Sequence, residues 1–174
     1  GMVSRLAEQK GIDVLSEALG DILCEKEIQF VGLGSGDDQL AEQLHSLQER
    51  FPEQVGFENG YCNALAHQIE AGADYFVIPS RFEPCGLNQM YSLRYGTIPI
   101  VNGVGGLIDT VRDIGNQQPT GLVLNRLTVQ ALTEAFKKAC DIYGSVQSVE
   151  ILKRGMRAEY GWENSSNQYL RCYQ

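Results

Sequence analysis

The hydrophobic and polar positions of this chain alternate in blocks that predict strands and helices in turn. Short apolar runs have the composition of buried strands, and between them apolar residues recur every three or four positions, as on one face of a helix. In residues 11–24, for example, Leu15, Leu19 and Leu23 fall on one helical face. The predicted strands are residues 2–4, 28–33, 55–58, 75–78, 98–101 and 122–124. The predicted helices are residues 11–24, 38–51, 64–71, 86–96, 107–111, 129–143, 149–157 and 162–173.

Strands that alternate with helices through short loops indicate a parallel sheet with both faces covered. We therefore predict an α/β fold, a single doubly wound, Rossmann-like domain over residues 2–174, with Gly1 as a remnant of cloning. In this class the ligand lies at the carboxyl ends of the strands. The first strand looks short, so we also expect either a groove beside it or a loss of stability. The loops expected to rim one crevice are residues 5–10, 34–37, 60–61, 79–85 and 103–106.

Composition narrows the possible functions. The formal charge of −8 argues against nucleic acid as a partner. No apolar run approaches the roughly 20 residues of a membrane span, and we expect no signal peptide. Five cysteines without a CxxC spacing favour reduced, cytosolic thiols, and with only two histidines we expect no metal site.

The stretch 73–96 carries the strongest candidate chemistry. An apolar strand, a polar turn and a helix starting at Gly86 would aim free peptide N–H groups at an anion above the turn. Glu83, in that turn, can accept sugar hydroxyls or oppose positive charge on a sugar carbon, although a surface role is the alternative. Cys85 has no histidine in the same segment, so we favour a lining role over a nucleophilic one.

Other candidates lie in neighbouring loops. Arg5 and Lys10 follow the first strand and can neutralise a diphosphate, or simply be solvated charges. Gly34 belongs to a glycine-rich segment that lacks the GxGxxG spacing but would let a nucleotide approach the backbone. Tyr61 either stacks on a base or packs in the core, and Arg81 either reaches phosphate or pairs with Glu83.

The segments SRLAEQKG, GY, PSRFEPCGLNQ, YGTIPIV and GGLIDTV together resemble the bacterial glycogen synthase and plant starch synthase family. The resemblance covers essentially the whole chain and identifies it with the C-terminal, donor-binding half of a GT-B glycosyltransferase. It implies a retaining transfer of glucose from ADP-glucose or UDP-glucose to the non-reducing end of an α-1,4-glucan, without metal or cofactor.

The resemblance also implies roles for individual residues. Arg5 and Lys10 match the residues that hold the diphosphate and stabilise it as it leaves, and Glu83 matches the acid that contacts the glucose. Tyr61 matches the residue that stacks on the base. The remaining positions expected to bind the nucleotide sugar are Gly34, Cys85, Gly86, Leu87 and Asn88. Asn88 replaces the family's usual threonine, and residues 102–104 replace a more basic, hydroxylic stretch.

The same resemblance sets expectations for partners and location. The glucan acceptor would bind through an N-terminal half that this sequence does not include, so we expect the fragment alone to be inactive. The last helix, about 162–173, would pack toward that half. We expect no nucleic acid or membrane partner, and a cytoplasmic location in a bacterium or a plastid location in a plant. The alternative is a nucleotide-sugar-binding module of another GT-B transferase with a different acceptor.

Overall fold

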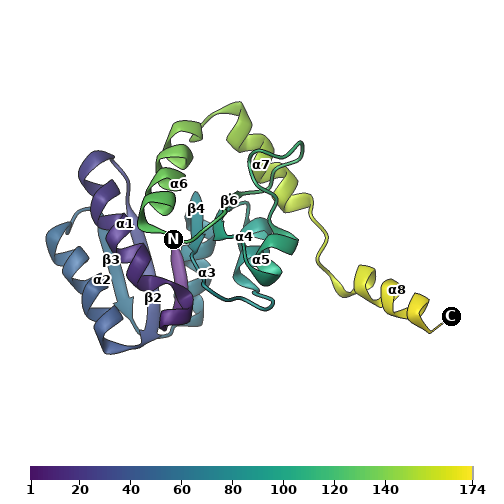
Figure 1. The fold of residues 1–174 in the computed structure, drawn as a ribbon, viewed down its shortest axis with the longest axis horizontal. Coiled ribbons are helices and arrows are strands. Elements are labelled where there is room, and N and C mark those ends of the chain that lie inside the picture. Colours follow the sequence, from purple (N-terminus) through teal and green to yellow (C-terminus); the bar gives the residue numbers. More distant parts are fainter. Residues whose placement is uncertain (174) are drawn as a thin grey trace.

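The computed structural model describes residues 1–173 and contains a parallel sheet in two three-stranded parts (Figure 1). Within the parts the strand orders are β1-β2-β3 and β4-β5-β6, and every pairing is parallel. The parts meet at Gly1, whose amino group donates to the Tyr75 carbonyl at 2.7 Å and whose carbonyl accepts from the Val77 N–H at 2.9 Å. The strands are β1 (Met2–Leu6), β2 (Phe30–Gly36), β3 (Val55–Asn59), β4 (Tyr75–Ile78), β5 (Ile98–Asn102) and β6 (Leu122–Leu124).

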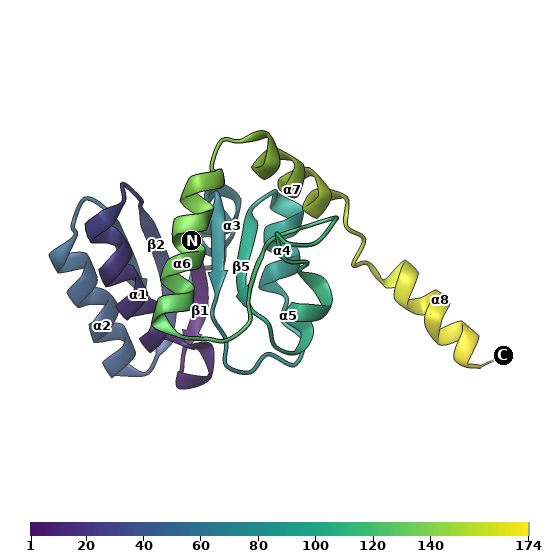
Figure 2. The same ribbon diagram turned by 45° about the horizontal axis from the view of Figure 1, so that its top comes forward.

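Helices cover both faces of this sheet, which confirms the predicted doubly wound α/β fold (Figures 1 and 2). One layer consists of α1, α2 and α6, and α6 packs along α1 after the chain has crossed back from β6. The other layer contains α3, α4, α5 and α7. The helices are α1 (Ile12–Glu25), α2 (Asp38–Arg50), α3 (Asn63–Gly72), α4 (Asn88–Tyr95), α5 (Gly105–Thr110), α6 (Val129–Ile142), α7 (Val146–Arg157) and α8 (Trp162–Cys172), with a short 3-10 helix, η1 (Glu8–Lys10), before α1.

The apolar periodicity of the sequence becomes the core. In α1, Leu15 and Leu19 face the sheet and are buried, as their spacing predicted. On the opposite face, Leu33 of β2, Ile69 of α3 and Phe76 of β4 form a smaller apolar cluster. From β1 the strands continue in one direction through β2 to β3, and from β4 they continue in the opposite direction through β5 to β6. Doubly wound sheets bind ligands at the point where the strand order reverses, which here lies between β1 and β4.

Several predicted boundaries were wrong near the carboxyl edge of the sheet. Gly34 was expected in a turn, but β2 continues to Gly36 because it pairs with β1 on one side and β3 on the other. Arg5 likewise lies within β1 and not in the following loop. Helix α4 begins at Asn88, two residues later than predicted, and α5 already begins at Gly105.

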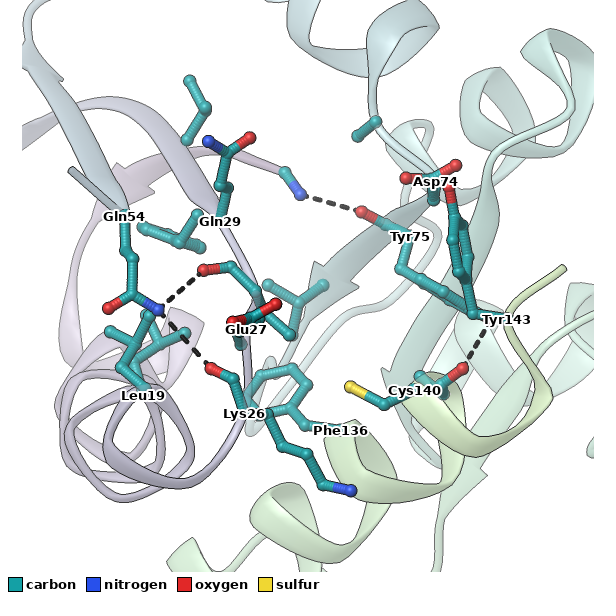
Figure 3. A pocket seen from close by; sticks show the side chains of 18 of the residues that line it. Leu19, Lys26, Glu27, Gln29, Gln54, Asp74, Tyr75, Phe136, Cys140 and Tyr143 are labelled. Atoms are coloured by element: carbon teal, nitrogen blue, oxygen red, sulfur yellow. Dashed lines mark hydrogen bonds between the residues drawn. The ribbon is translucent and has the colours of Figure 1, made fainter.

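A large cavity of about 1230 Å³ opens at the amino ends of β2 and β4, and we call it the amino-edge cavity (Figure 3). Gly1 lines it, so the groove expected beside the first strand is present. Hydrogen bonds connect its walls. The Tyr75 hydroxyl donates to the Ala139 carbonyl at 2.8 Å, and the Gln54 side-chain amide donates to the Ile28 carbonyl at 3.1 Å.

Helix α8 extends away from the rest of the molecule in both ribbon views (Figures 1 and 2). Trp162 is 79% exposed and Tyr169 61% exposed. Its expected packing against another half of a larger enzyme stays a prediction. Among residues 1–173, no helix has the length and apolar character required to cross a membrane.

Candidate functional site

The fold brings the β1–α1 and β4–α4 loops together at the carboxyl edge of the sheet. The Lys10 ammonium contacts the Glu83 carboxylate directly, and both side chains are largely buried, at 18% and 12% exposure. The Ser80 hydroxyl lies 3.3 Å from the same carboxylate oxygen. Two candidates separated by 73 positions in the sequence therefore form one ion pair.

Local sequence explains why Lys10 faces this edge. The chain leaves β1, makes the single turn η1 and reverses at Gly11, which has a left-handed φ of 67°. A side chain at Gly11 would place its Cβ 2.1 Å from the Pro79 carbonyl oxygen, so only glycine allows this approach. Pro79 follows β4 directly, and the two loops therefore touch through their backbones.

A second, small cavity of about 180 Å³ lies between β1 and β4, and we call it the carboxyl-edge cavity. Arg5, Lys10 and Glu83 line it together with Gly86 and Leu87. Asn88 also lines it, but its side-chain amide donates to the Val3 carbonyl at 2.8 Å and so satisfies the open side of β1. The Asn88 side-chain NH2 group thus forms a hydrogen bond that stabilises the fold.

Helix α4 points its amino end at this cavity. Gly86 adopts a left-handed φ of 74°, and the N-cap residue Leu87 makes no side-chain capping bond. The first N–H groups of an α-helix have no partner within the helix, and here they coincide with the positive end of the helix dipole. The predicted anion-binding arrangement is therefore present, although it starts later than Gly86.

The turn before α4 is held by residues that the sequence analysis missed. Gln89 is fully buried and its amide donates to the Cys85 carbonyl at 3.1 Å and the Gly86 carbonyl at 3.0 Å. From the first turn of α5, the Gly106 N–H donates to the Glu83 carbonyl at 3.0 Å. The sequence places Gln89, a polar residue, in the first turn of a predicted helix, which could have drawn attention to it. Its hydrogen-bond partners, however, depend on the tertiary fold.

Within residues 1–173, the remaining predicted residues make no hydrogen bond with the Lys10–Glu83 pair. The Arg5 side chain is exposed, and no partner for it is found within the described part of the chain. The Cys85 thiol is exposed and contacts only its own turn, at 3.6 Å from the Gly86 carbonyl. Tyr61 is 77% exposed in the β3–α3 loop, so a core position for it is wrong. Two strand spacings, about 10 Å, separate β3 from β1.

The structure corrects the turn position predicted for Gly34 and the pairing of Arg81 with Glu83. Gly34 is buried within β2, where an added Cβ would come within 2.2 Å of the Ser4 carbonyl oxygen, so close strand packing explains this glycine. Arg81 does not pair with Glu83, whose carboxylate contacts Lys10. The Arg81 guanidinium binds both carboxylate oxygens of Asp13, at 2.7 and 2.6 Å, and these hydrogen bonds hold the pKa of Asp13 below its ordinary value.

The site thus combines cations, one carboxylate and unpaired N–H groups around a small hollow. Lysine has three N–H donors, and one is directed at Glu83, so two remain for an anion. The second oxygen of Glu83 remains an acceptor for a hydroxyl group. Such a set can bind a molecule that carries negative charge next to hydroxyl groups. No cluster of three or more metal-ligating side chains occurs among residues 1–173.

Comparison with known proteins places this geometry in a family. Residues 1–150 match the model of the family "Glycosyl transferases group 1". The chain is 46% identical to the glycogen synthase of Thioalkalivibrio sulfidiphilus, covering 99% of this chain and 37% of that protein. It is 48% identical to the glycogen synthase of Myxococcus xanthus, covering 97% of this chain and 35% of that protein.

A solved structure is similar over the same extent. The catalytic domain of starch synthase IV from Arabidopsis thaliana, bound to ADP and acarbose, superimposes with a TM-score of 0.88 at 32% identity. The match covers 99% of this chain and 37% of that one. The chain therefore spans a little over a third of the length of these relatives.

Proposed function

The chain belongs to the group 1 glycosyl transferases, and we propose that it is the donor-binding half of a retaining glucosyltransferase. In this proposal the parent enzyme transfers glucose from ADP-glucose to the non-reducing end of an α-1,4-glucan, without a metal or other cofactor. The acceptor binds to a part of the enzyme outside the region matched here, and the chain alone is inactive. Since the curated relatives named above are bacterial, we propose a bacterial cytoplasmic location.

One observation carries the proposal: the Lys10–Glu83 pair beside the open amino end of α4. A nucleoside diphosphate sugar has a charged diphosphate next to a ring of hydroxyl groups. The free N–H groups of Lys10 and α4 suit the diphosphate, and the unpaired oxygen of Glu83 suits the sugar. A free sugar would leave the cations unpaired, and a simple phosphate would leave Glu83 unused.

The relatives support the choice of glucose and adenine. Two of them are glycogen synthases at 46% and 48% identity, and the similar starch synthase structure holds ADP. Tyr61 follows β3 at the carboxyl edge of the sheet, and β3 lies two strand spacings, about 10 Å, from β1. That separation leaves room for a nucleoside between the diphosphate and the aromatic ring, so we assign Tyr61 to stacking on the base.

In the proposed reaction, the bond between the anomeric carbon and the diphosphate oxygen breaks while the oxygen of the acceptor hydroxyl bonds to that carbon from the same face. The hydroxyl proton passes to the leaving diphosphate oxygen. Lys10, Arg5 and the α4 N–H groups stabilise the negative charge that gathers on the leaving diphosphate. Each preorganised donor of this kind is worth about 3 kcal/mol in the transition state. Glu83 fixes the glucose and opposes the positive charge that develops on the anomeric carbon.

Calorimetric titration of this chain with ADP and ADP-glucose tests the donor assignment. We expect both ligands to bind, and Lys10→Ala to weaken both by about 10- to 100-fold, since charged hydrogen bonds contribute about 1.5–3 kcal/mol. Arg5→Ala should weaken both in the same direction.

The matched control is Lys26→Ala, because Lys26 lines the amino-edge cavity at the other end of the sheet. This variant should bind both ligands like the unaltered chain. Unchanged affinity in Lys10→Ala, or no binding of either ligand to the unaltered chain, would contradict the proposed function.

A further inference from the structure

We propose that Arg81 and Asp13 form a positioning pair that keeps Lys10 and Glu83 in register, so that the site favours a nucleotide sugar over the free nucleotide. The inference rests on the proposed function, and it assigns a role to two residues that touch neither the diphosphate nor the sugar. Arg81 comes from the loop that carries Glu83, and Asp13 comes from the first turn of α1, directly after Lys10 and Gly11.

The Arg81 guanidinium joins the two loops by three hydrogen bonds. Two run in parallel to the carboxylate of Asp13, at 2.7 and 2.6 Å, and the third reaches the Glu8 carbonyl at 2.6 Å. A planar guanidinium bound at both ends of a carboxylate fixes orientation as well as distance, which an ammonium group cannot do. Arg81 is thereby held against both ends of the segment that presents Lys10.

Backbone contacts extend this junction to the site. The Arg81 N–H donates to the Gln9 carbonyl at 2.8 Å, and the Gln9 side chain donates to the Phe82 carbonyl at 2.8 Å. Lys10 directly follows Gln9, and Glu83 directly follows Phe82. The bonds that join Gln9 to Arg81 and Phe82 therefore set the distance between the Lys10 ammonium and the Glu83 carboxylate.

This register matters only to a ligand that spans both residues. ADP carries the diphosphate that Lys10 binds but has no glucose for Glu83. ADP-glucose must satisfy Lys10 and Glu83 at once, so a small relative shift of the loops weakens its sugar contacts while leaving the diphosphate contacts. Misplacement on the order of 1 Å is enough to impair such a preorganised arrangement.

A purely structural pair would act differently. Asp13 and Arg81 are each 37% exposed, and ion pairs at that exposure contribute little to stability. If the pair only stabilised the fold, its loss would lower the fraction of folded protein and affect both ligands alike. The folded fraction affects both dissociation constants equally, so their ratio, measured on one sample, does not depend on it. A change in this ratio therefore indicates a change in the relative position of Lys10 and Glu83.

The test measures dissociation constants for ADP and ADP-glucose in Asp13→Ala, Arg81→Ala and the double variant. We expect the preference for ADP-glucose to fall by about fivefold in each single variant and no further in the double variant, because either change breaks the same Arg81–Asp13 pair. Asp13→Asn, which retains one acceptor for Arg81 and perturbs α1 least, should fall in between.

Lys137→Ala provides the matched control. Lys137 pairs with Glu25 at 2.6 Å, is similarly exposed at 40%, and also joins α1 to another element, but far from the site. Its loss should leave the ratio unchanged. An unchanged ratio in Asp13→Ala and Arg81→Ala, with the unaltered chain preferring ADP-glucose, would overturn the positioning role alone. Failure of the unaltered chain to bind either ligand would overturn the proposed function and this inference with it.

Discussion

The cavity at the amino ends of the strands encloses about 1230 Å³, whereas the cavity between β1 and β4 at the carboxyl ends encloses about 180 Å³. The larger one is lined by apolar side chains together with scattered polar and charged groups, and its hydrogen bonds connect one wall to another. The smaller one collects Arg5, Lys10 and Glu83 under the amino end of α4. We therefore base the proposed binding site on charges that converge with free N–H groups, and not on cavity volume.

The two edges also differ in how closely their backbones approach. At the carboxyl edge, an added Cβ at Gly11 would lie 2.1 Å from the Pro79 oxygen, and one at Gly106 would lie 2.0 Å from the Cys85 oxygen. At the amino edge, Gly72 has nothing within 4 Å of an added Cβ. The loops of the site are therefore packed to backbone contact, which holds their charged groups in place before a ligand arrives.

Substitution of Gly106 by alanine should have the largest effect on stability and binding of the substitutions that compare the two edges. The new Cβ would collide with the backbone of Cys85, so the turn before α4 must move. We expect a loss of more than about 3 kcal/mol in the free energy of unfolding and no measurable ADP-glucose binding. Gly72→Ala, beside the amino-edge cavity, should change stability by less than about 1 kcal/mol and leave binding intact. Chemical denaturation with calorimetry checks both, and equal effects at the two glycines would remove the contrast.

A smaller, pH-dependent effect should arise outside both cavities, at Glu70 of α3. This side chain is 5% exposed, one of its carboxylate oxygens has no partner within residues 1–173, and burial raises its pKa to about 7 from an ordinary 4.5. Because the folded state favours the protonated form, the stabilising contribution is full below about pH 4.5 and is lost as the pH rises through about 7. At pH 8 the charged form should cost about 3 kcal/mol.

Glu70→Met should remove that pH dependence and raise stability at pH 8. Urea denaturation of both proteins at pH 5 and pH 8 checks it, since other groups that titrate in this range remain the same in the two proteins. The affinity for ADP-glucose should be equal in the two proteins at each pH. If stability changes between pH 5 and pH 8 by as much in Glu70→Met as in the unaltered chain, another group is responsible for the change. An altered affinity would extend the site beyond the carboxyl edge.

Local patterns were sufficient to predict much of the fold. Leu15 and Leu19 recur at helical spacing and became core residues of α1, and residues 75–78 were predicted as the strand that the structure contains. The strand–turn–helix unit around Glu83 was also predicted, because an apolar run precedes the turn. Lys10 was predicted at the site because it lies directly before a segment with helical periodicity.

Features that depend on distant partners could not be predicted in this way. Arg81 forms hydrogen bonds with Asp13, which lies 68 positions away in the sequence. Gln89 forms one with Thr110, which lies 21 positions away. Gly34 looks like a loop glycine until β1 and β3 are placed on either side of it. In each case the sequence reveals a residue type, but the partner that decides its role is supplied by the packing of separate elements.

The central claim is that a nucleotide sugar binds at the carboxyl edge and not in the larger amino-edge cavity. Backbone amide shifts of the isotopically labelled chain, followed by NMR during titration with ADP-glucose, test it most directly. We expect the largest shifts at Lys10, Gly86 and Asn88, with the amides of residues 26–30 and 73–75 unchanged. Shifts concentrated at residues 26–30 and 73–75, with Gly86 and Asn88 unchanged, would contradict it.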